Sequence, residues 1–160
     1  MPFVATANPP HAPAESVLVN DGWWPDFDPK QVRAACRLDG TVTPERLRPA
    51  LQAAILSINA ELLVWREAQR QLGYEKLTDV PAPTLGGQSA HALRYARAVH
   101  ACLQADLMEA YRNISALPEG SGKEQRVMEA LAVQIDEQRR QQRWAVSDLL
   151  GRPRTTVELI

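Results

Sequence analysis

The residues able to do acid–base or metal chemistry are few, and their spacing does not build a catalytic centre. His91 and His100 lie nine positions apart in one helical stretch, so they face opposite sides of a helix. His11 lies far away in a proline-rich segment, and solvated or core histidine is the expected state rather than a metal-ligand set. Residues 120–123 (Gly-Ser-Gly-Lys) resemble part of a phosphate-binding loop, but Leu117 stands where that motif requires glycine.

The carboxylates give no better candidate for chemistry. Glu61, Glu67, Asp106 and Glu109 could approach one another in the fold, yet charged side chains on helices usually line solvated faces. The motifs G-x-S-x-G, H-E-x-x-H and G-x-G-x-x-G are absent from the sequence. We therefore expect a protein that is not an enzyme and that uses no metal and no cofactor.

Arginines form the one uneven charge distribution. The residues concerned are Arg139, Arg140, Arg143, Arg152 and Arg154, with Asp148 as the one acidic residue among them. Two interpretations stay open. Cations near the end of a helix complement its dipole on a solvated face. Alternatively, Arg139, Arg140 and Arg143 form an anion-facing patch for an acidic partner or a nucleic-acid backbone.

Composition indicates a soluble, intracellular chain of one domain. The net charge is −1 and 45% of the residues are apolar, so bulk charge does not point to nucleic acid. No run approaches the roughly 20 apolar residues of a membrane span, and no secretory signal is visible. Cys36 and Cys102 form no C-x-x-C pair, which favours reduced thiols in a cytosolic protein.

The stretch from Thr43 to Gly73 is the element expected to organise the chain. Thr43 can cap a helix with Pro44 at its first position, and Gly73 can close it in the left-handed conformation. Apolar residues recur at spacings of three and four, which lines one helix face. They are Leu47, Leu51, Ile55, Ile58, Leu62 and Trp65. We expect one helix of about 43 Å with a kink near Pro49.

Three further helices complete the predicted core. The first begins at Asp28 and Pro29 and runs to about Leu38. Another follows Ser89, from about residue 90 to 113, and the last runs from a Ser121/Glu124 capping box to about Leu150. Their predicted apolar faces are Leu93, Ala96, Val99, Leu103, Leu107, Ala110 and Ile114, and then Val127, Leu131, Ile135, Trp144 and Leu149. The sequence predicts an all-α fold, an antiparallel bundle of about four helices.

Both ends of the chain read as extended. The expected organisation is an N-terminal arm (1–22), a helical domain (23–151) and a C-terminal tail (152–160). The proline-rich arm is either disordered or ordered on a neighbouring subunit. The aromatic side chains of Trp23, Trp24 and Phe27 either lock the arm onto the domain or anchor a subunit interface. The β-branched residues at 155–160 either fray or add a strand to another protein's sheet.

Several segments together resemble a known family. The segments are 24–29, Val32 and Arg33, 37–42, 46–48, 59–62, Gly73 and Tyr74, Leu77, 79–81, 95–99, 105–112, 143–151 and 154–160, including Trp24-Pro25-Asp26-Phe27 and Arg143-Trp144-Ala145-Val146. They cover about residues 23–160 in register. In these residues the chain resembles the head completion/stabilisation proteins (GPL-type) of contractile-tailed temperate phages.

The resemblance implies a structural role in the virion. Such a protein is expected to assemble in the host cytoplasm and bind beneath the portal protein after DNA packaging, as a homo-oligomeric ring of twelve copies. It would stabilise the filled head, offer a surface to a tail terminator or neck protein, and touch the genomic double-stranded DNA in passing, without any membrane. The alternative is a DNA-binding packaging factor similar to a small terminase, with the anion-facing patch on phosphates.

The resemblance also gives the site residues their expected roles. The portal-binding residues are Arg152, Arg154, Thr155, Thr156, Val157, Glu158, Leu159 and Ile160, with 155–160 docking by strand addition. The subunit-interface residues are Trp23, Trp24 and Phe27.

Overall fold

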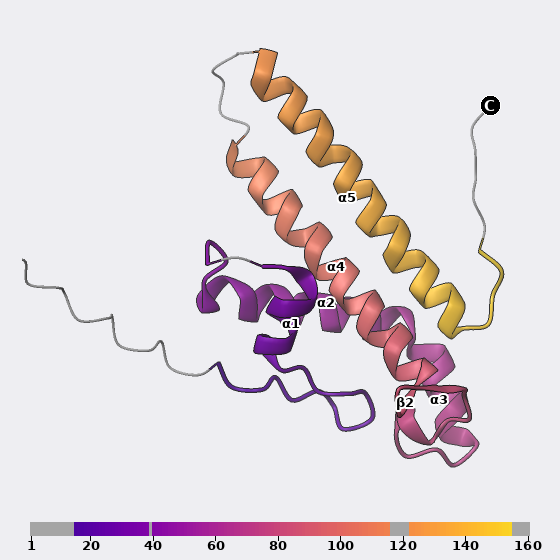
Figure 1. Cartoon of the computed structure of the whole chain (residues 1–160). Helices are drawn as coiled ribbons and strands as arrows, with labels where there is room; N and C mark the ends of the chain where they lie inside the picture. The colour runs from indigo at the N-terminus through magenta and orange to yellow at the C-terminus, as the bar shows by residue number, and fades with distance from the viewer. Residues whose placement is uncertain (1–14, 39, 116–121, 155–160) are drawn as a thin grey trace, which may run out of the picture.

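The computed structural model of the chain describes residues 15–38, 40–115 and 122–154, and these residues are mostly helical (Figure 1). Their helices are α1 (Pro29–Cys36), α2 (Pro44–Glu61), α3 (Leu63–Gln71), α4 (Ala90–Ser115) and α5 (Gly122–Leu149). A 3-10 turn (Leu77–Asp79) and a small hairpin of β1 (Thr84–Leu85) and β2 (Gln88–Ser89) join α3 to α4. The prediction of a mostly helical fold is confirmed.

The starts of three helices follow the predicted capping residues. The Asp28 carboxylate accepts a hydrogen bond from the backbone N–H of Lys30 at 2.9 Å, with Pro29 at the first helical position. The Ser89 hydroxyl accepts from the N–H of His91 at 3.3 Å. Thr43 holds the cap position of α2, but its side chain makes no capping bond. The predicted capping box at Ser121 and Glu124 lies outside the described residues.

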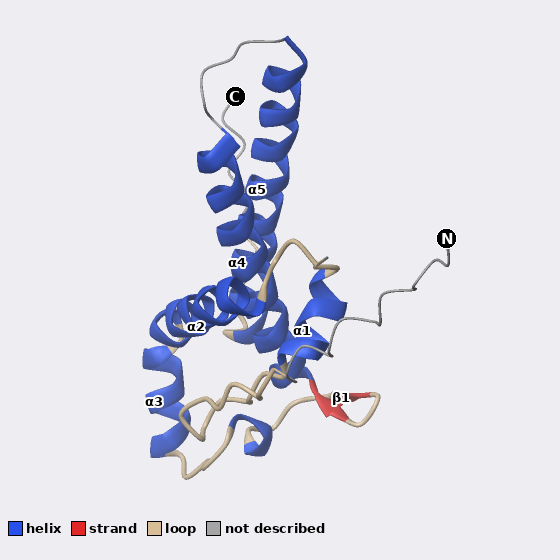
Figure 2. Ribbon diagram, turned by 90° about the vertical axis from the view of Figure 1, so that its left-hand side faces the viewer, coloured by secondary structure: helices blue, strands red, loops and turns tan. Residues whose placement is uncertain are grey.

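The expected single helix from Thr43 to Gly73 is wrong, because the chain bends at Leu62. There α2 ends and α3 begins, and the two axes differ by 61° (Figure 2). No glycine or proline stands at the bend. Helix α2 continues through Pro49, and the kink expected there stays a prediction. The bend follows from packing: Leu62 is fully buried, and Trp65 of α3 lies against Trp23 at a ring distance of 6.0 Å.

Three glycines after α3 adopt a positive φ, a conformation that other residues rarely take. Gly73 closes α3 at φ +93°, and Tyr74 N–H donates to the Gln69 carbonyl at 3.3 Å, a helix-closing pattern that leaves α3 with the predicted end. Gly86 and Gly87 form the two-residue turn of the β1–β2 hairpin with φ of +57° and +77°. Positive φ at both central positions is the geometry of a tight hairpin turn.

Helix α4 is the centre of the core. The buried faces of α2 and α4 pack against each other, and α2 crosses α4 instead of running alongside it (Figures 1 and 2). The predicted face of α2 is confirmed, since Leu47, Leu51, Ile55, Ile58 and Leu62 are all buried. Burial on α4 extends beyond the predicted stripe to Tyr95, Ala98, Ala101, Cys102 and Ala105. The antiparallel four-helix bundle is not confirmed.

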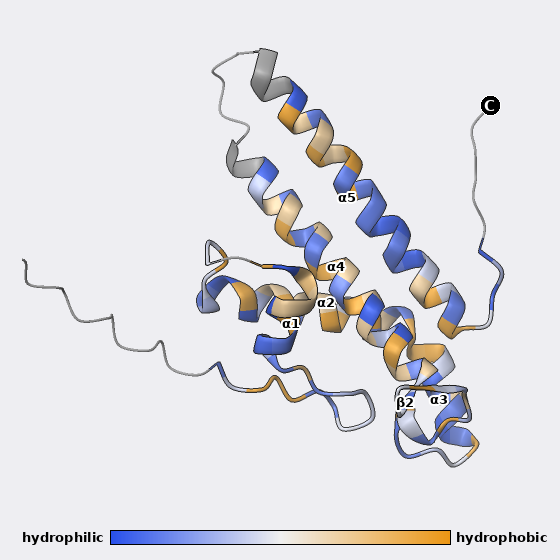
Figure 3. Ribbon diagram, viewed as in Figure 1, coloured by the Kyte–Doolittle hydropathy of each residue, from blue (hydrophilic) through white to orange (hydrophobic). Residues whose placement is uncertain are grey.

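Helices α4 and α5 form an antiparallel pair that projects from this core (Figure 1). In α5 the core contacts gather near its C-terminal end, where Ala145, Val146 and Leu149 are buried. The middle of α5 is hydrophilic (Figure 3). Val127 was predicted to face the core, but its side chain is 60% exposed, because α4 is the main neighbour of α5 among the described elements.

Among the described residues, no single helix is long and apolar enough to cross a membrane. The bent pair of α2 and α3 meets that criterion jointly by length and composition.

Candidate functional site

The segment 15–22, here called the arm segment, is extended and lies on the helical domain. Leu18 pairs with Phe27 as an antiparallel bridge, with N···O distances of 2.8 and 3.0 Å between their backbones. The Leu18 side chain is buried in the core. Glu15 and Arg33 of α1 form two hydrogen bonds of 2.8 Å, and Arg48 of α2 donates to the Ser16 carbonyl at 3.2 Å. Residues 15–22 of the expected arm therefore pack on the helical domain; residues 1–14 lie outside the described residues.

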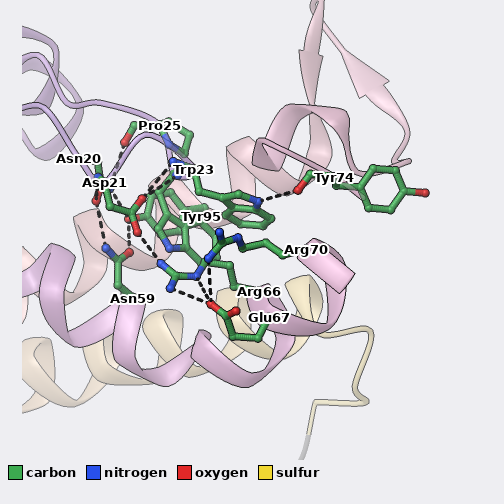
Figure 4. A network of polar contacts seen from close by, with 11 residues as sticks. Asn20, Asp21, Trp23, Pro25, Asn59, Arg66, Glu67, Arg70, Tyr74 and Tyr95 are labelled. Atoms are coloured by element: carbon green, nitrogen blue, oxygen red, sulfur yellow. Dashed lines mark hydrogen bonds and ion pairs between the residues drawn. The ribbon is translucent and has the colours of Figure 1, made fainter. Parts of the chain in front are cut away.

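A ring of polar side chains fastens the arm segment to α2 and α4 (Figure 4). Asn59 donates to the Asn20 side-chain oxygen at 3.0 Å, and Asn20 donates to the Tyr95 hydroxyl at 2.9 Å. The Tyr95 hydroxyl donates back to the Asn59 oxygen at 2.6 Å, which closes the ring. Burial raises the pKa of Tyr95, so its hydroxyl stays protonated and keeps this donor role.

Asp21 makes the turn that leads from the arm segment into the aromatic residues. Its carboxylate accepts from the backbone N–H groups of Trp23 and Trp24 at 3.1 and 3.2 Å. The other carboxylate oxygen pairs with Arg66 of α3, which also binds Glu67 at 2.9 Å. An aspartate that accepts from the backbone two and three residues ahead stabilises a turn without regular secondary structure. The turn is therefore fixed from the α3 side.

The aromatic cluster consists of Trp23, Trp24 and Tyr95, which are buried, and of Trp65, which is partly buried. Trp24 stacks on Tyr95 at 4.5 Å, and Trp23 meets Trp24 edge-on at 4.6 Å. The Trp23 indole N–H donates to the Tyr74 carbonyl at 3.1 Å, whereas the buried Trp24 indole N–H has no hydrogen-bond partner among the described residues.

The residues predicted for a subunit interface are thus buried within one copy. Trp23, Trp24 and Phe27 are 7%, 2% and 5% exposed. This matches the first of the two roles considered for them, which is to lock the arm onto the domain. So little exposed surface leaves them a small direct contact with a neighbour, and their place in a subunit interface stays a prediction.

Acidic side chains of the same chain neutralise most of the predicted anion-facing patch. Arg139 lies between Asp106 and Glu109 of α4, at 2.7 and 2.9 Å. Arg140 pairs with Glu137 and lies over the Trp144 ring at 5.0 Å. Arg143 is exposed and makes no ion pair within the described part of the chain. Local charge pairing therefore occupies two of the three arginines.

The start of the C-terminal tail is held against the end of α5. Gly151 has φ +66°, and the Arg152 N–H donates to the Ser147 carbonyl at 2.8 Å. Arg154 donates two hydrogen bonds to Asp148, at 2.9 and 2.6 Å, and lies 5.1 Å from the Trp144 ring centre. Arg154 also holds the pKa of Asp148 below its usual range by this hydrogen bonding. Arg152 is exposed; residues 155–160 lie outside the described residues.

The structure has a groove between the arm segment and α2 that the sequence did not predict. It has a volume of about 710 Å³, and we call it the arm groove. Leu18–Asp21 form one wall, Ile55, Leu56 and Asn59 of α2 the other, and Leu63 lies at the α3 end. Leu56 and Leu63 are 68% and 46% exposed. Their positions off the buried stripe of α2 were the signal in the sequence for a second apolar face.

The histidines and cysteines form no site in the described ranges. No cluster there of three or more His, Cys, Asp or Glu residues could hold a metal ion. His91 lies against Trp65 and His100 against Phe27, and burial lowers the pKa of both imidazoles. Cys36 and Cys102 are buried free thiols.

Comparisons with known proteins agree on one family. Residues 18–160 match the family described as phage head completion protein (GPL). The "Head completion/stabilization protein" of Escherichia phage P2 is 40% identical over 152 residues, which is 95% of this chain and 88% of that protein. The "Probable head completion/stabilization protein" of Haemophilus phage HP1 is 23% identical over 101 residues, 63% of this chain and 67% of that protein. No solved structure gives a significant match.

Proposed function

Because this chain belongs to the family of phage head completion proteins (GPL), we propose that it acts as the adaptor between the filled head and the tail. A head completion and stabilisation protein is a structural component of the virion. In the proposed role, copies assembled in the host cytoplasm form a dodecameric ring below the portal after DNA packaging. The ring then stabilises the filled capsid and gives the tail terminator or neck protein its attachment surface.

The observation that carries this proposal is the anchored start of the C-terminal tail. The Arg154–Asp148 pair and the Arg152–Ser147 bond fix where the chain leaves α5. The residues that follow, Thr155 to Ile160, are β-branched or apolar, with one glutamate. A strand-forming segment that leaves a rigid helix end is suited to adding an edge strand to the portal. Arg152 is the exposed cation available to acidic portal residues, and Arg154 orients the tail.

The proposal is tested by sedimentation with the portal ring of the same phage. The full chain should sediment with the portal at high salt, because backbone pairing and apolar burial are screened less than exposed charge pairs. Deletion of residues 155–160 should abolish this association while the helical content stays unchanged. Undiminished binding by the truncated chain would refute docking through the tail.

The alternative of a small-terminase-like DNA-binding factor has less support in the structure. Its phosphate contacts would come from Arg139, Arg140 and Arg143, and the first two already pair with acidic side chains of the same chain. A steep fall of DNA affinity with rising salt would favour this alternative, since each phosphate contact adds to the slope.

A further inference from the structure

The arm segment presents a free backbone edge. Leu18 exchanges both of its backbone hydrogen bonds with Phe27. In such a pair, the residues on either side point their N–H and C=O groups toward the opposite edge. Those residues are Val17 and Val19, and their backbone groups have no hydrogen-bond partner within the described residues. One more strand can therefore pair along 17–19.

Apolar surface surrounds this edge. Val17 and Val19 are 49% and 72% exposed, and the arm groove lies between the same segment and α2. Leu56 and Leu63 add exposed apolar side chains along the groove. A row of unpaired backbone groups beside exposed apolar side chains is a template for strand addition. The occupant should thus be an extended segment with at least one large apolar side chain.

Residues 3–8 of this chain have that character. They read Phe-Val-Ala-Thr-Ala-Asn, without proline, whereas Pro2, Pro9, Pro10 and Pro13 surround them. A proline-free run can donate backbone hydrogen bonds at every position. Phe3 is the one aromatic residue before the arm segment and supplies the large apolar side chain. Residues 155–160 have similar composition, but the proposed function already places them on the portal.

The connection between residues 8 and 15 favours a neighbouring copy over the same chain. Asn8, Pro9 and Ala12 each precede a proline, and a residue before proline favours extended over helical backbone, which opposes a tight return. At roughly 3.1 Å per residue, a spacer of six extended residues, the number from 9 to 14, can reach about 19 Å. The spacer starts from a fixed point, because Glu15 is held by Arg33.

The reach of this segment is sufficient for an adjacent subunit. Six residues of strand add about 20 Å, for a total of roughly 39 Å beyond Glu15. A compact chain of this length has a radius of gyration of about 15 Å, so the segment can span one subunit. We propose that residues 3–8 of one copy add as a strand to the Val17–Val19 edge of the next copy, with Phe3 in its arm groove. This inference rests on the proposed ring and names the contact that links its neighbours.

Disulfide trapping between different chains tests the contact. One chain carries one added cysteine, Val4→Cys or Ala5→Cys, beside the buried Cys36 and Cys102. Positions 4 and 5 lie on opposite faces of a strand and so cover both registers. The other chain carries Leu56→Cys. The control chain carries Val133→Cys in place of Leu56→Cys. Val133 lies on α5 and is 69% exposed. Mixed chains are oxidised alone and on the portal ring, and linked dimers are resolved by mass.

We expect one of the two arm cysteines to give roughly tenfold more linked dimer with Leu56→Cys than with the control, because docking raises the local thiol concentration. A chain that carries both cysteines should then give a ladder of multimers. If the two cysteines of that double variant instead form a disulfide within one chain, the segment docks on its own copy and the proposed contact between neighbours is wrong. Portal binding without any excess of linked dimer would overturn this inference alone. If the unmodified chain does not bind the portal, the proposed function is wrong, and the inference that rests on it is wrong as well.

Discussion

The phenol ring of Tyr95 and the indole ring of Trp24 lie nearly parallel, with 4.5 Å between centroids and 11° between planes. This stack joins α4 to the turn that follows the arm segment. The Tyr95 hydroxyl also closes the hydrogen-bond ring with Asn20 and Asn59. One side chain therefore carries both an apolar and a polar attachment of the arm segment, and its two contributions can be measured separately.

Tyr95→Phe keeps the ring stack and removes the hydroxyl. It leaves the half-buried side-chain amides of Asn20 and Asn59 each without one partner, so the free energy of unfolding should fall by about 1 kcal/mol. Urea unfolding measures the change. Tyr111→Phe is the matched control, because Tyr111 is 62% exposed and should tolerate the change within about 0.5 kcal/mol. Equal midpoints for both variants would show that the hydrogen-bond ring contributes nothing.

Glu15→Gln should reveal a pH-dependent attachment of the arm segment. Hydrogen bonding from Arg33 holds the pKa of Glu15 below its ordinary value. Its stabilising contribution is therefore present above the unfolded pKa of about 4.3 and is lost as pH falls through the folded pKa. The variant should be less stable than the wild type by up to about 1 kcal/mol at pH 7. This gap should close below about pH 4.

The measurement is urea unfolding of both proteins from pH 7 to pH 3. Glu75→Gln is the control for the loss of one negative charge, since Glu75 is exposed. A gap that stays constant with pH would mean that Glu15 acts through packing rather than through its charge.

Cys36 should resist alkylation in the folded protein. Burial raises the pKa of its thiol to about 11, and the side chain is 7% exposed. At pH 8 roughly one thiol in a thousand is then the reactive thiolate. Mass spectrometry after iodoacetamide treatment should find little modification until denaturant is added. Labelling of the native chain as fast as the unfolded chain would contradict the buried position.

Arg139→Gln should destabilise the α4–α5 pair. The substitution leaves Asp106 and Glu109 facing each other without their shared cation, at a cost of about 1 kcal/mol for partly exposed groups. Arg143→Gln one turn away removes an exposed arginine and should change stability by less than about 0.5 kcal/mol. Thermal unfolding compares the two variants. If Arg139→Gln is no more destabilising than Arg143→Gln, the ion pairs of Arg139 with Asp106 and Glu109 do not stabilise the helix pair.

The helix starts and the apolar face of α2 were predictable because they depend on local residues. Asp28 and Ser89 cap their helices, and Leu47 to Leu62 face the core as their spacing indicates. The bend at Leu62 was not predictable, because no helix-breaking residue marks it and the aromatic cluster determines it.

The arrangement of the candidate surfaces depends on contacts between distant residues, and the sequence does not display these. The prolines of residues 1–22 predicted an arm that is disordered or ordered on a neighbouring subunit, whereas Asn20 contacts Asn59 and Tyr95 of the same folded chain. In the same way, nothing near Arg139 in the sequence indicates that Asp106 and Glu109 neutralise it. The roles of residues 155–160 and of the predicted subunit interface stay predictions.

The projecting pair of α4 and α5 has a consequence for how this family can vary. Beyond the core, each of these helices has mainly the other as its neighbour. Adding or removing one turn in both helices together would change the reach of the projection by about 5.4 Å and leave the crossing of α2 and α4 intact. In the proposed adaptor role, related proteins can therefore match partners of different dimensions by small paired insertions, without changes to the interior.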